Sequence, residues 1–252
     1  MKHLLFFLTI SVFLTACQKS SDSGGGNNNN NPGTVTDASG NIYPTVTIGT
    51  QTWMAENLRT TKYTDGTDIP VVTSNTQWST NWNNGTTLKQ PMMCWYNNDQ
   101  ATYTANKFGA LYNWYAINPA TNGNKNVCPT GWHIPTDAEW NILIANLDPT
   151  YNPTAIGLQS TIAGGKMKST GTQYWISPNT GATNSSGWSG LPCGNRSTTG
   201  VFLNIEYVGY WLSASDTNNN FVWTRYLYHS NMIVYRDYYN KANGFSVRCI
   251  KD

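Results

Sequence analysis

The segment 131–140 contains three side chains that could do chemistry. His133, Asp137 and Glu139 lie close together, and a histidine with two carboxylates is a common general acid–base group. However, Thr136 and Glu139 have the Thr-x-x-Glu spacing of a capping box, in which each side chain binds the other residue's backbone N–H. Acidic residues in a first helical turn are also favoured by the helix dipole. We therefore expect both acids to start a helix and His133 to be a hydrogen-bonded structural residue.

Four cysteines, Cys94, Cys128, Cys193 and Cys249, are a second set of potentially reactive groups. An even number of cysteines in an exported chain favours two disulfides, and three connectivities are possible. No pair has the Cys-x-x-Cys spacing of a zinc or redox site. We expect structural disulfides and no metal site.

A fifth cysteine, Cys17, belongs to a targeting signal. Lys2 and His3 precede the apolar residues 4–14, a stretch too short to span a bilayer and typical of an export signal. Leu-Thr-Ala at residues 14–16, just before Cys17, resembles the bacterial lipobox, in which the cysteine is acylated and becomes the first mature residue. We expect a signal peptide over residues 1–16 and a lipid anchor at Cys17 in the cell outer membrane. Surface exposure is favoured over the periplasmic face, although residues 18–22 lack a strong acidic run.

The rest of the chain divides into a tether and one domain. Residues 17–34 are rich in Ser, Gly and Asn, a composition typical of a disordered linker. Residues 35–252 are enough for one domain with a single core. The chain of 252 residues has a net charge of only +2, with 11% charged residues, so it has no basic footprint for nucleic acid.

The elements that must position these residues are mixed. Trp140, Leu143, Ile144 and Leu147 repeat at helical spacing, which predicts a helix over residues 137–147, and residues 109–117 predict a second. Alternating residues around Gly49-Thr50 predict a β-hairpin over 41–54. Antiparallel strands are expected over 221–228, 232–238 and 244–250. The predicted class is α+β, with a long Gly/Ser/Thr/Asn-rich stretch over 157–204 of the kind that often carries function.

Five separated segments resemble the Fibrobacter succinogenes major paralogous domain family. They are residues 51–63, 109–116, 209–215, Cys-Pro-Thr-Gly-Trp-His-Ile-Pro-Thr-Asp-Ala-Glu-Trp at 128–140, and Gly-Phe-Ser-Val-Arg-Cys-Ile-Lys-Asp at 244–252. The resemblance implies a C-type-lectin-like fold, akin to the domain of formylglycine-generating enzymes, with two helices packed on antiparallel sheets and long irregular loops. Family members are typically exported proteins of Bacteroidota-like bacteria without an assigned reaction. By analogy with lectin-like domains, Cys128 pairs with Cys249, which leaves Cys94 to pair with Cys193.

The activities known in similar folds find little support in these residues. A formylglycine-generating oxidase needs a reactive cysteine pair that binds copper, and the corresponding late region offers only Cys193. Iron-dependent sulfoxide synthases need three histidines, whereas the mature chain has His133 and His229. The Glu-Pro-Asn and Gln-Pro-Asp triplets of calcium-dependent lectins are missing from the sequence. We expect no catalytic residue, cofactor or metal, and the chain is predicted not to be an enzyme.

The expected function is binding. Trp175 and Trp188 lie in the stretch 157–204, where lectin-like folds usually carry their ligand surface, and a flat indole can stack on a sugar or anchor a protein contact. We expect Trp175, Trp188, Asn195 and Arg196 to line a groove. The sequence favours a non-catalytic, membrane-anchored module that binds an extracellular glycan or protein. A structural or assembly component of the cell envelope or of a surface appendage is the alternative, and an enzyme of unknown type is a third possibility.

Overall fold

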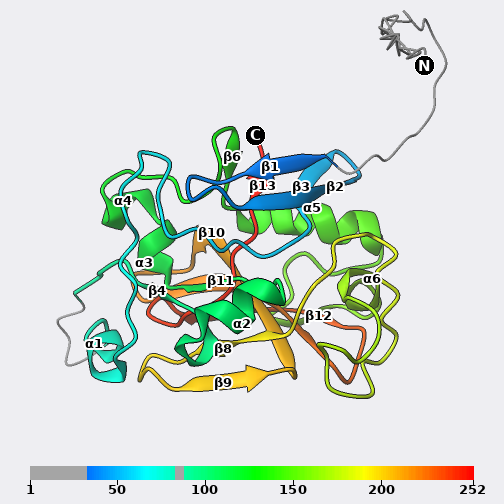
Figure 1. Cartoon of the computed structure of the whole chain (residues 1–252). Coiled ribbons are helices and arrows are strands. Elements are labelled where there is room, and N and C mark those ends of the chain that lie inside the picture. Colours follow the sequence, from blue (N-terminus) through cyan, green and yellow to red (C-terminus); the bar gives the residue numbers. More distant parts are fainter. Residues whose placement is uncertain (1–32, 83–87) are drawn as a thin grey trace, which may run out of the picture.

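The computed structural model describes residues 33–82 and 88–252. The predicted signal peptide, the lipidation site Cys17 and nearly all of the predicted tether therefore lie outside the described residues. The described part is mixed α and β, with more strand than helix (Figure 1). This agrees with the predicted α+β class.

One sheet joins the two ends of the described chain (Figure 1). Its strands, in order, are β1 (Thr34–Thr36), β2 (Ile42–Ile48), β3 (Gln51–Met54), β13 (Ile250–Lys251) and β6 (Trp132–His133). All of its pairs are antiparallel. β2 and β3 form the predicted hairpin, in which Gly49 has a φ of +60°. This left-handed φ favours glycine, and a Cβ at Gly49 would also displace the Asn146 side chain, whose Oδ1 would lie 2.2 Å away.

A second sheet holds most of the C-terminal third. Its order is β7 (Gly157–Ser160), β12 (Val234–Asn240), β11 (Phe221–Tyr228), β10 (Val208–Asp216), β8 (Cys193–Arg196) and β9 (Phe202–Ile205). Every pair is antiparallel except β10 with β8. The strand predicted over 244–250 is mostly replaced by isolated bridges, such as Tyr112 with Phe245 and Trp211 with Ser246. A two-stranded ladder of β4 (Met93–Cys94) and β5 (Leu111–Tyr112) completes the strands of the described residues.

Six α-helices occur in the described part, where the sequence predicted two. They are α1 (Asn75–Ser79), α2 (Gln100–Ala105), α3 (Trp114–Ile117), α4 (Pro119–Asn122), α5 (Asp137–Leu147) and α6 (Ala163–Met167), with a 3₁₀ turn η2 (Tyr96–Asn98) before α2. α5 matches its prediction, whereas α3 covers only the second half of the other. Within the ranges 33–82 and 88–252, no helix has the length and apolar character needed to cross a bilayer.

One of the hydrophobic cores joins α5 to both large sheets. The apolar face predicted for α5 is buried and consists of Trp140, Leu143, Ile144 and Leu147. Trp140 contacts Trp53 of β3, with ring centroids 5.0 Å apart, and also Trp188, at 5.7 Å. Trp188 in turn meets Trp211 of β10 edge to face, at 4.7 Å. This row of four indoles fixes the N-terminal hairpin over the second sheet.

The last strand is also tied covalently. A disulfide joins Cys128 to Cys249, next to β13, across a sequence separation of 121. The predicted Cys128–Cys249 pairing is therefore confirmed. It joins the segment before β6 to the residue just before β13, the strand that lies between β3 and β6.

Candidate functional site

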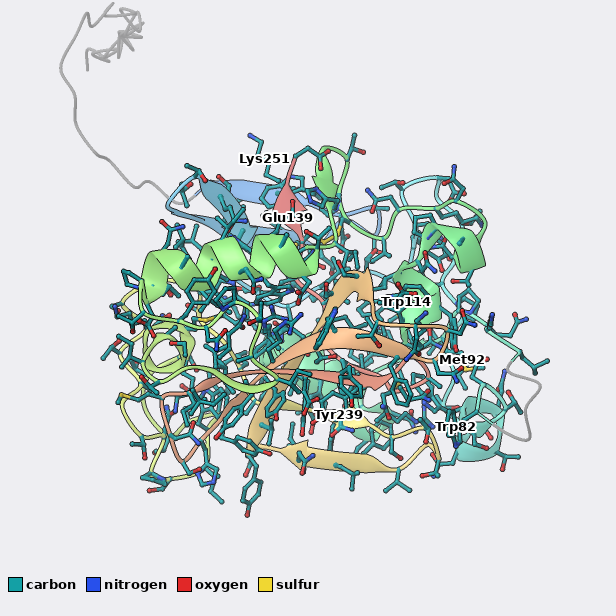
Figure 2. The ribbon with its side chains drawn as sticks, turned by 180° about the vertical axis from the view of Figure 1, so that it is seen from behind. Trp82, Met92, Trp114, Glu139, Tyr239 and Lys251 are labelled. Carbon is teal, nitrogen blue, oxygen red and sulfur yellow. A yellow bond between two sulfur atoms is a disulfide. The ribbon has the colours of Figure 1, made fainter. Side chains whose placement is uncertain are left out.

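The acid–base candidates in segment 131–140 are occupied by structural contacts. Thr136 and Glu139 form the predicted capping box at the start of α5. His133 lies between two carboxylates, with Nε2 2.8 Å from Glu139 Oε1 and Nδ1 2.6 Å from Asp252 Oδ1. Figure 2 shows Glu139 at this end of α5, close to the strand that ends at Lys251. His133 is thus hydrogen-bonded through both ring nitrogens, as predicted.

Asp137 holds α5 to the second sheet. Its Oδ1 accepts a hydrogen bond of 2.8 Å from Arg225 of β11, and its Oδ2 accepts one of 2.8 Å from Arg236 of β12. Burial works against ionisation of Asp137, but the two guanidinium groups outweigh it and hold the pKa of this carboxyl below its ordinary value. A carboxylate fixed in this way is suited to anchoring and not to proton transfer.

Trp175, Trp188, Asn195 and Arg196 are all buried, so the structure does not expose them together along one groove as predicted. Trp188 is 0% exposed within the indole row and Trp175 is 1% exposed, although Trp175 borders a small hollow of about 290 Å³. Arg196 is buried between the rings of Trp78 and Phe202, and Asn195 accepts a hydrogen bond from Asn204. Large aromatic side chains stabilise a fold most when they are removed from water. In this domain the Gly/Ser-rich loop folds over its tryptophans and buries them.

The predicted Cys94–Cys193 disulfide is also wrong, because both cysteines are free and buried. They lie on different strands, Cys94 on β4 and Cys193 on β8. The Cys193 thiol donates to the carbonyl of Phe108 at 2.9 Å and accepts from the Asn57 amide at 2.9 Å. Burial raises the pKa of both thiols to about 12. These thiols stay protonated at neutral pH and are poor nucleophiles and poor metal ligands.

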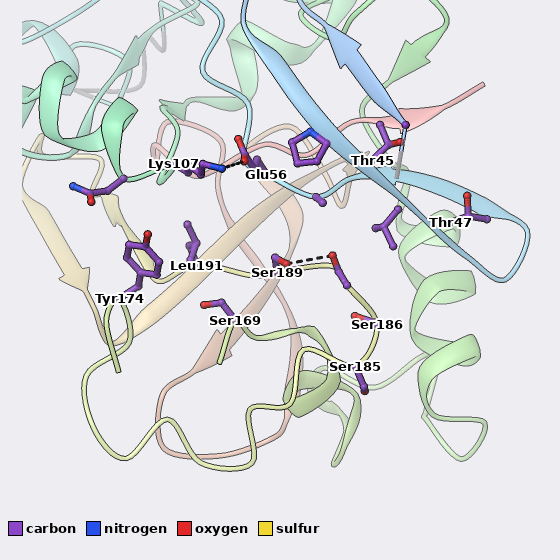
Figure 3. Close-up of a pocket in the computed structure, with 16 residues that line it drawn as sticks. Thr45, Thr47, Glu56, Lys107, Ser169, Tyr174, Ser185, Ser186, Ser189 and Leu191 are labelled. Atoms are coloured by element: carbon purple, nitrogen blue, oxygen red, sulfur yellow. Dashed lines mark hydrogen bonds and ion pairs between the residues drawn. The ribbon is translucent and has the colours of Figure 1, made fainter. Parts of the chain in front are cut away.

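A groove of about 640 Å³ is the strongest candidate for a ligand site (Figure 3). One wall is residues 44–47 of β2, continued by residues 55–56 after β3, and the opposite wall is formed by residues between 169 and 191. Asn106 and Lys107, directly after α2, close one end. The volume falls in the range of small-molecule sites. The predicted loop stretch 157–204 thus contributes a wall, through side chains other than those predicted.

The groove combines many hydroxyl groups with one aromatic ring. The hydroxyl-bearing side chains are Thr45, Thr47, Ser169, Ser185, Ser186 and Ser189. Tyr174 faces the groove from the 169–191 wall (Figure 3), and its ring is held edge to face against Phe108 at 5.4 Å. Val46 and Leu191 add apolar surface. Several of these hydroxyls also bond within the protein: Ser186 donates to the carbonyl of Lys166 and Ser189 to that of Gly187. Because a hydroxyl oxygen can accept two hydrogen bonds, the groove still offers acceptors around a fixed ring, an arrangement that can bind a polar, polyhydroxylated molecule.

The two charged side chains that line the groove, Glu56 and Lys107, form an ion pair, and Glu56 forms a second one with Arg59. Glu56 accepts from Lys107 Nζ at 2.8 Å and, through its other oxygen, from Arg59 Nη1 at 3.0 Å. The Glu56 side chain is 10% exposed. Both carboxylate oxygens are therefore engaged, which leaves Glu56 poorly placed to act as a general base.

Buried polar residues hold the 169–191 wall in place. Arg248 donates to the carbonyls of Trp188 and Ser189, the latter at 2.8 Å, and to Asn57 Oδ1 at 2.8 Å. Its guanidinium also stacks over Trp188, 3.8 Å from the ring centroid. Complete burial lowers the pKa of Arg248 to about 9, which leaves it charged at neutral pH. The wall is thus largely formed before any ligand binds.

Sequence reasoning missed the groove residues Glu56, Lys107 and Tyr174 and the supporting pair Asn57 and Arg248. Glu56, Asn57 and Arg248 lie inside segments already singled out, 51–63 and 244–252, so their position in those motifs was an available signal. Lys107 and Tyr174 carry no such signal. In the described ranges, no group of three or more His, Cys, Asp or Glu side chains is placed to hold a metal ion.

Comparison with known proteins gives one match. A model of the Fibrobacter succinogenes major domain family matches residues 46–251. No curated protein and no solved structure matches the chain. The matched range includes both walls of the groove except for its edge at residues 33 and 44–45.

Proposed function

The chain belongs to the Fibrobacter succinogenes major domain family, and from this premise we propose that it is a non-catalytic, surface-exposed outer-membrane lipoprotein whose lectin-like domain binds a glycan in the groove. The anchor and the location rest on the lipobox-like sequence before Cys17. The binding role rests on the groove. The lectin-like assignment rests on the resemblance of the five sequence segments.

The observation that carries the binding proposal is the composition of the groove. Sugars present rings of C–H groups beside many hydroxyls, so sites for them need a flat apolar surface and several hydrogen-bonding groups. Tyr174 supplies the flat surface, and the Ser and Thr hydroxyls supply the polar groups. Because Phe108 and Leu191 support the ring and this wall, little side-chain freedom is lost on binding, which favours affinity.

The non-catalytic part of the proposal is supported by how the acids are used. Glu56, the carboxylate that lines the groove, is neutralised by Arg59 and Lys107. Asp137 and Glu139 are committed to α5 and its partners. A general acid or base normally needs a free carboxyl or imidazole within hydrogen-bond reach of the substrate.

Binding of the full chain, solubilised in detergent, to a glycan array is the test. Tyr174→Ala should weaken binding of the recognised glycan by at least about tenfold, because a central aromatic contact is lost. Tyr238→Ala is the matched control, since Tyr238 is exposed on β12 and does not line the groove. Equal binding by wild type and Tyr174→Ala, or cross-linking to one stoichiometric envelope protein without any glycan binding, would contradict the proposal. The second result would support the role of an envelope component.

A further inference from the structure

At one end of the groove two cations pair with one carboxylate. Arg59 already balances Glu56, with Nη1 3.0 Å from Oε2. The Arg59 side chain is 13% exposed, donates to the carbonyl of Ile42 at 2.9 Å and stacks on Tyr43 at 4.4 Å from the ring centroid. A guanidinium fixed by three contacts stays with its carboxylate. Glu56 thus has two cationic partners, and Lys107 is the one that no further contact holds in place.

Lys107 is free to change its partner. Its side chain is 61% exposed, in contrast to the buried carboxylate that it contacts. An ion pair with one exposed member contributes little to stability because water competes for the ammonium. The ammonium can move from Glu56 to a ligand, or bridge the two, at small cost.

The backbone conformation at Lys107 is unusual for a lysine. Its φ is +63°, in the left-handed region, directly after Asn106 caps α2. Helices commonly end in this way, but the position is normally taken by glycine or asparagine, because other side chains are strained there. The end of α2 explains the conformation and leaves the residue type unexplained. Other non-glycine residues, such as Lys89 and Glu206, also have a positive φ, so the conformation fixes only where the Lys107 side chain leaves the backbone, at the end of the groove.

We infer that the groove selects acidic glycans, with the Lys107 ammonium binding a carboxylate or sulfate of the sugar while the hydroxyl-bearing walls and Tyr174 bind the rest. This inference rests on the proposed function and names the ligand class. Asn106 lies beside Lys107 at the same end; its amide nitrogen donates to the carbonyl of Thr102 at 3.0 Å, which leaves one N–H for a ligand. The charge-assisted bond from Lys107 would be formed only with a charged sugar.

The test compares matched pairs of oligosaccharides that differ only in charge. The full chain in detergent is titrated with oligogalacturonides and their methyl esters, and with a sulfated glycan beside its desulfated form, at low and high salt. Wild type should bind at least one acidic member about tenfold more tightly than its neutral partner, with a preference that shrinks at high salt. The pair that shows the preference distinguishes carboxylate from sulfate.

Lys107 variants then assign the preference. Lys107→Met should bind the acidic and neutral members equally, and Lys107→Arg should keep the preference. Lys62→Met is the control, because Lys62 is an exposed lysine in an ion pair with Asp68 and lies outside the groove. A wild-type preference for neutral glycans, or an acidic preference that survives Lys107→Met, would overturn the inference while leaving glycan binding intact. Failure to bind any glycan would remove both proposals.

Discussion

Replacing Lys168 with methionine should destabilise the domain from within the groove wall. Lys168 is fully buried at the start of the loop that carries Ser169 and Tyr174. Its ammonium donates to backbone carbonyls: Asn231 at 2.8 Å, Thr180 at 3.0 Å, Tyr228 at 3.1 Å and His229 at 3.4 Å. One side chain thus joins the loop to the β11–β12 connection.

The expected loss follows from these bonds and from the cost of burying the charge. Three of the four distances are short enough for good hydrogen bonds, and at the lower end for charged donors they contribute about 4–5 kcal/mol together. Removing the ammonium also relieves the penalty of burying a charge, which returns part of that amount. We expect Lys168→Met to lower the free energy of unfolding by about 2–4 kcal/mol, or the melting temperature by roughly 5–15 °C.

The stability difference between wild type and Lys168→Met should depend on pH, because Lys168 is a titratable group. Burial lowers the pKa of Lys168 from 10.5 to about 8 in the folded chain. Between about pH 8 and 10.5 the unfolded chain therefore binds more protons at this site than the folded chain does, so stability conferred by Lys168 rises with pH. The difference between wild type and Lys168→Met should widen as pH rises from 7 to 9.5.

Guanidinium denaturation followed by tryptophan fluorescence at pH 7 and pH 9.5 measures both effects. Lys166→Met is the control, because Lys166 makes a single bond to one carbonyl, that of Leu147 at 2.6 Å, and on the same scale its loss should cost only about 1.5 kcal/mol. If Lys168→Met unfolds at the same denaturant concentration as wild type, the carbonyl cluster does not stabilise the wall. A difference that narrows with rising pH would refute the argument from burial.

Three further predictions concern the first sheet and the thiols. Burial opposes protonation of His133, but its two carboxylate partners outweigh this and raise its pKa above 6.5. Below about pH 6.5 the wild type should therefore melt at a higher temperature than His133→Gln. This difference should disappear as the pH rises through the pKa of His133 in the folded chain. Replacing both Cys128 and Cys249 with serine should lower the free energy of unfolding by about 4–5 kcal/mol in denaturant titrations, because the bridge closes a loop of 121 residues. Cys94 and Cys193 should resist iodoacetamide in the folded protein and react after unfolding; a cross-linked Cys94–Cys193 peptide in mass spectra would contradict their assignment as free thiols.

The sequence predicted elements whose determinants are local. The capping box and apolar face of α5 lie within a dozen residues, and the β2–β3 hairpin depends on one turn and its alternating flanks. The short helices lacked such a signal, since five residues show little of a 3.6-residue period. α6 even contains two glycines, and a Cβ on Gly164 would lie 2.6 Å from the carbonyl oxygen of Ile233. Close packing, and not helix propensity, determines the sequence there.

The groove could not be predicted in the same way. Glu56, Lys107 and Tyr174 come from three distant segments that only the folded chain brings together. A Gly/Ser/Asn-rich sequence normally indicates exposed loops, and it therefore predicts exposed side chains for Trp175 and Trp188, which are buried. The prediction missed that this loop has its own buried polar residues. Asn179, for example, donates to the carbonyls of Ser169 and Gly171 at 3.0 and 2.6 Å.

Buried cations explain how such irregular loops become ordered. Carbonyls outside helices and sheets still need donors when they are buried, and Lys168, Arg196 and Arg248 each donate to two or more backbone carbonyls. A consequence follows for any mutational study of the groove. Substitutions at Lys168 or Arg248 should weaken binding of every ligand together with stability, because they deform the wall. A substitution at Lys107 should instead change the preference between acidic and neutral ligands at constant stability, and that difference separates residues that contact a ligand from residues that shape its site.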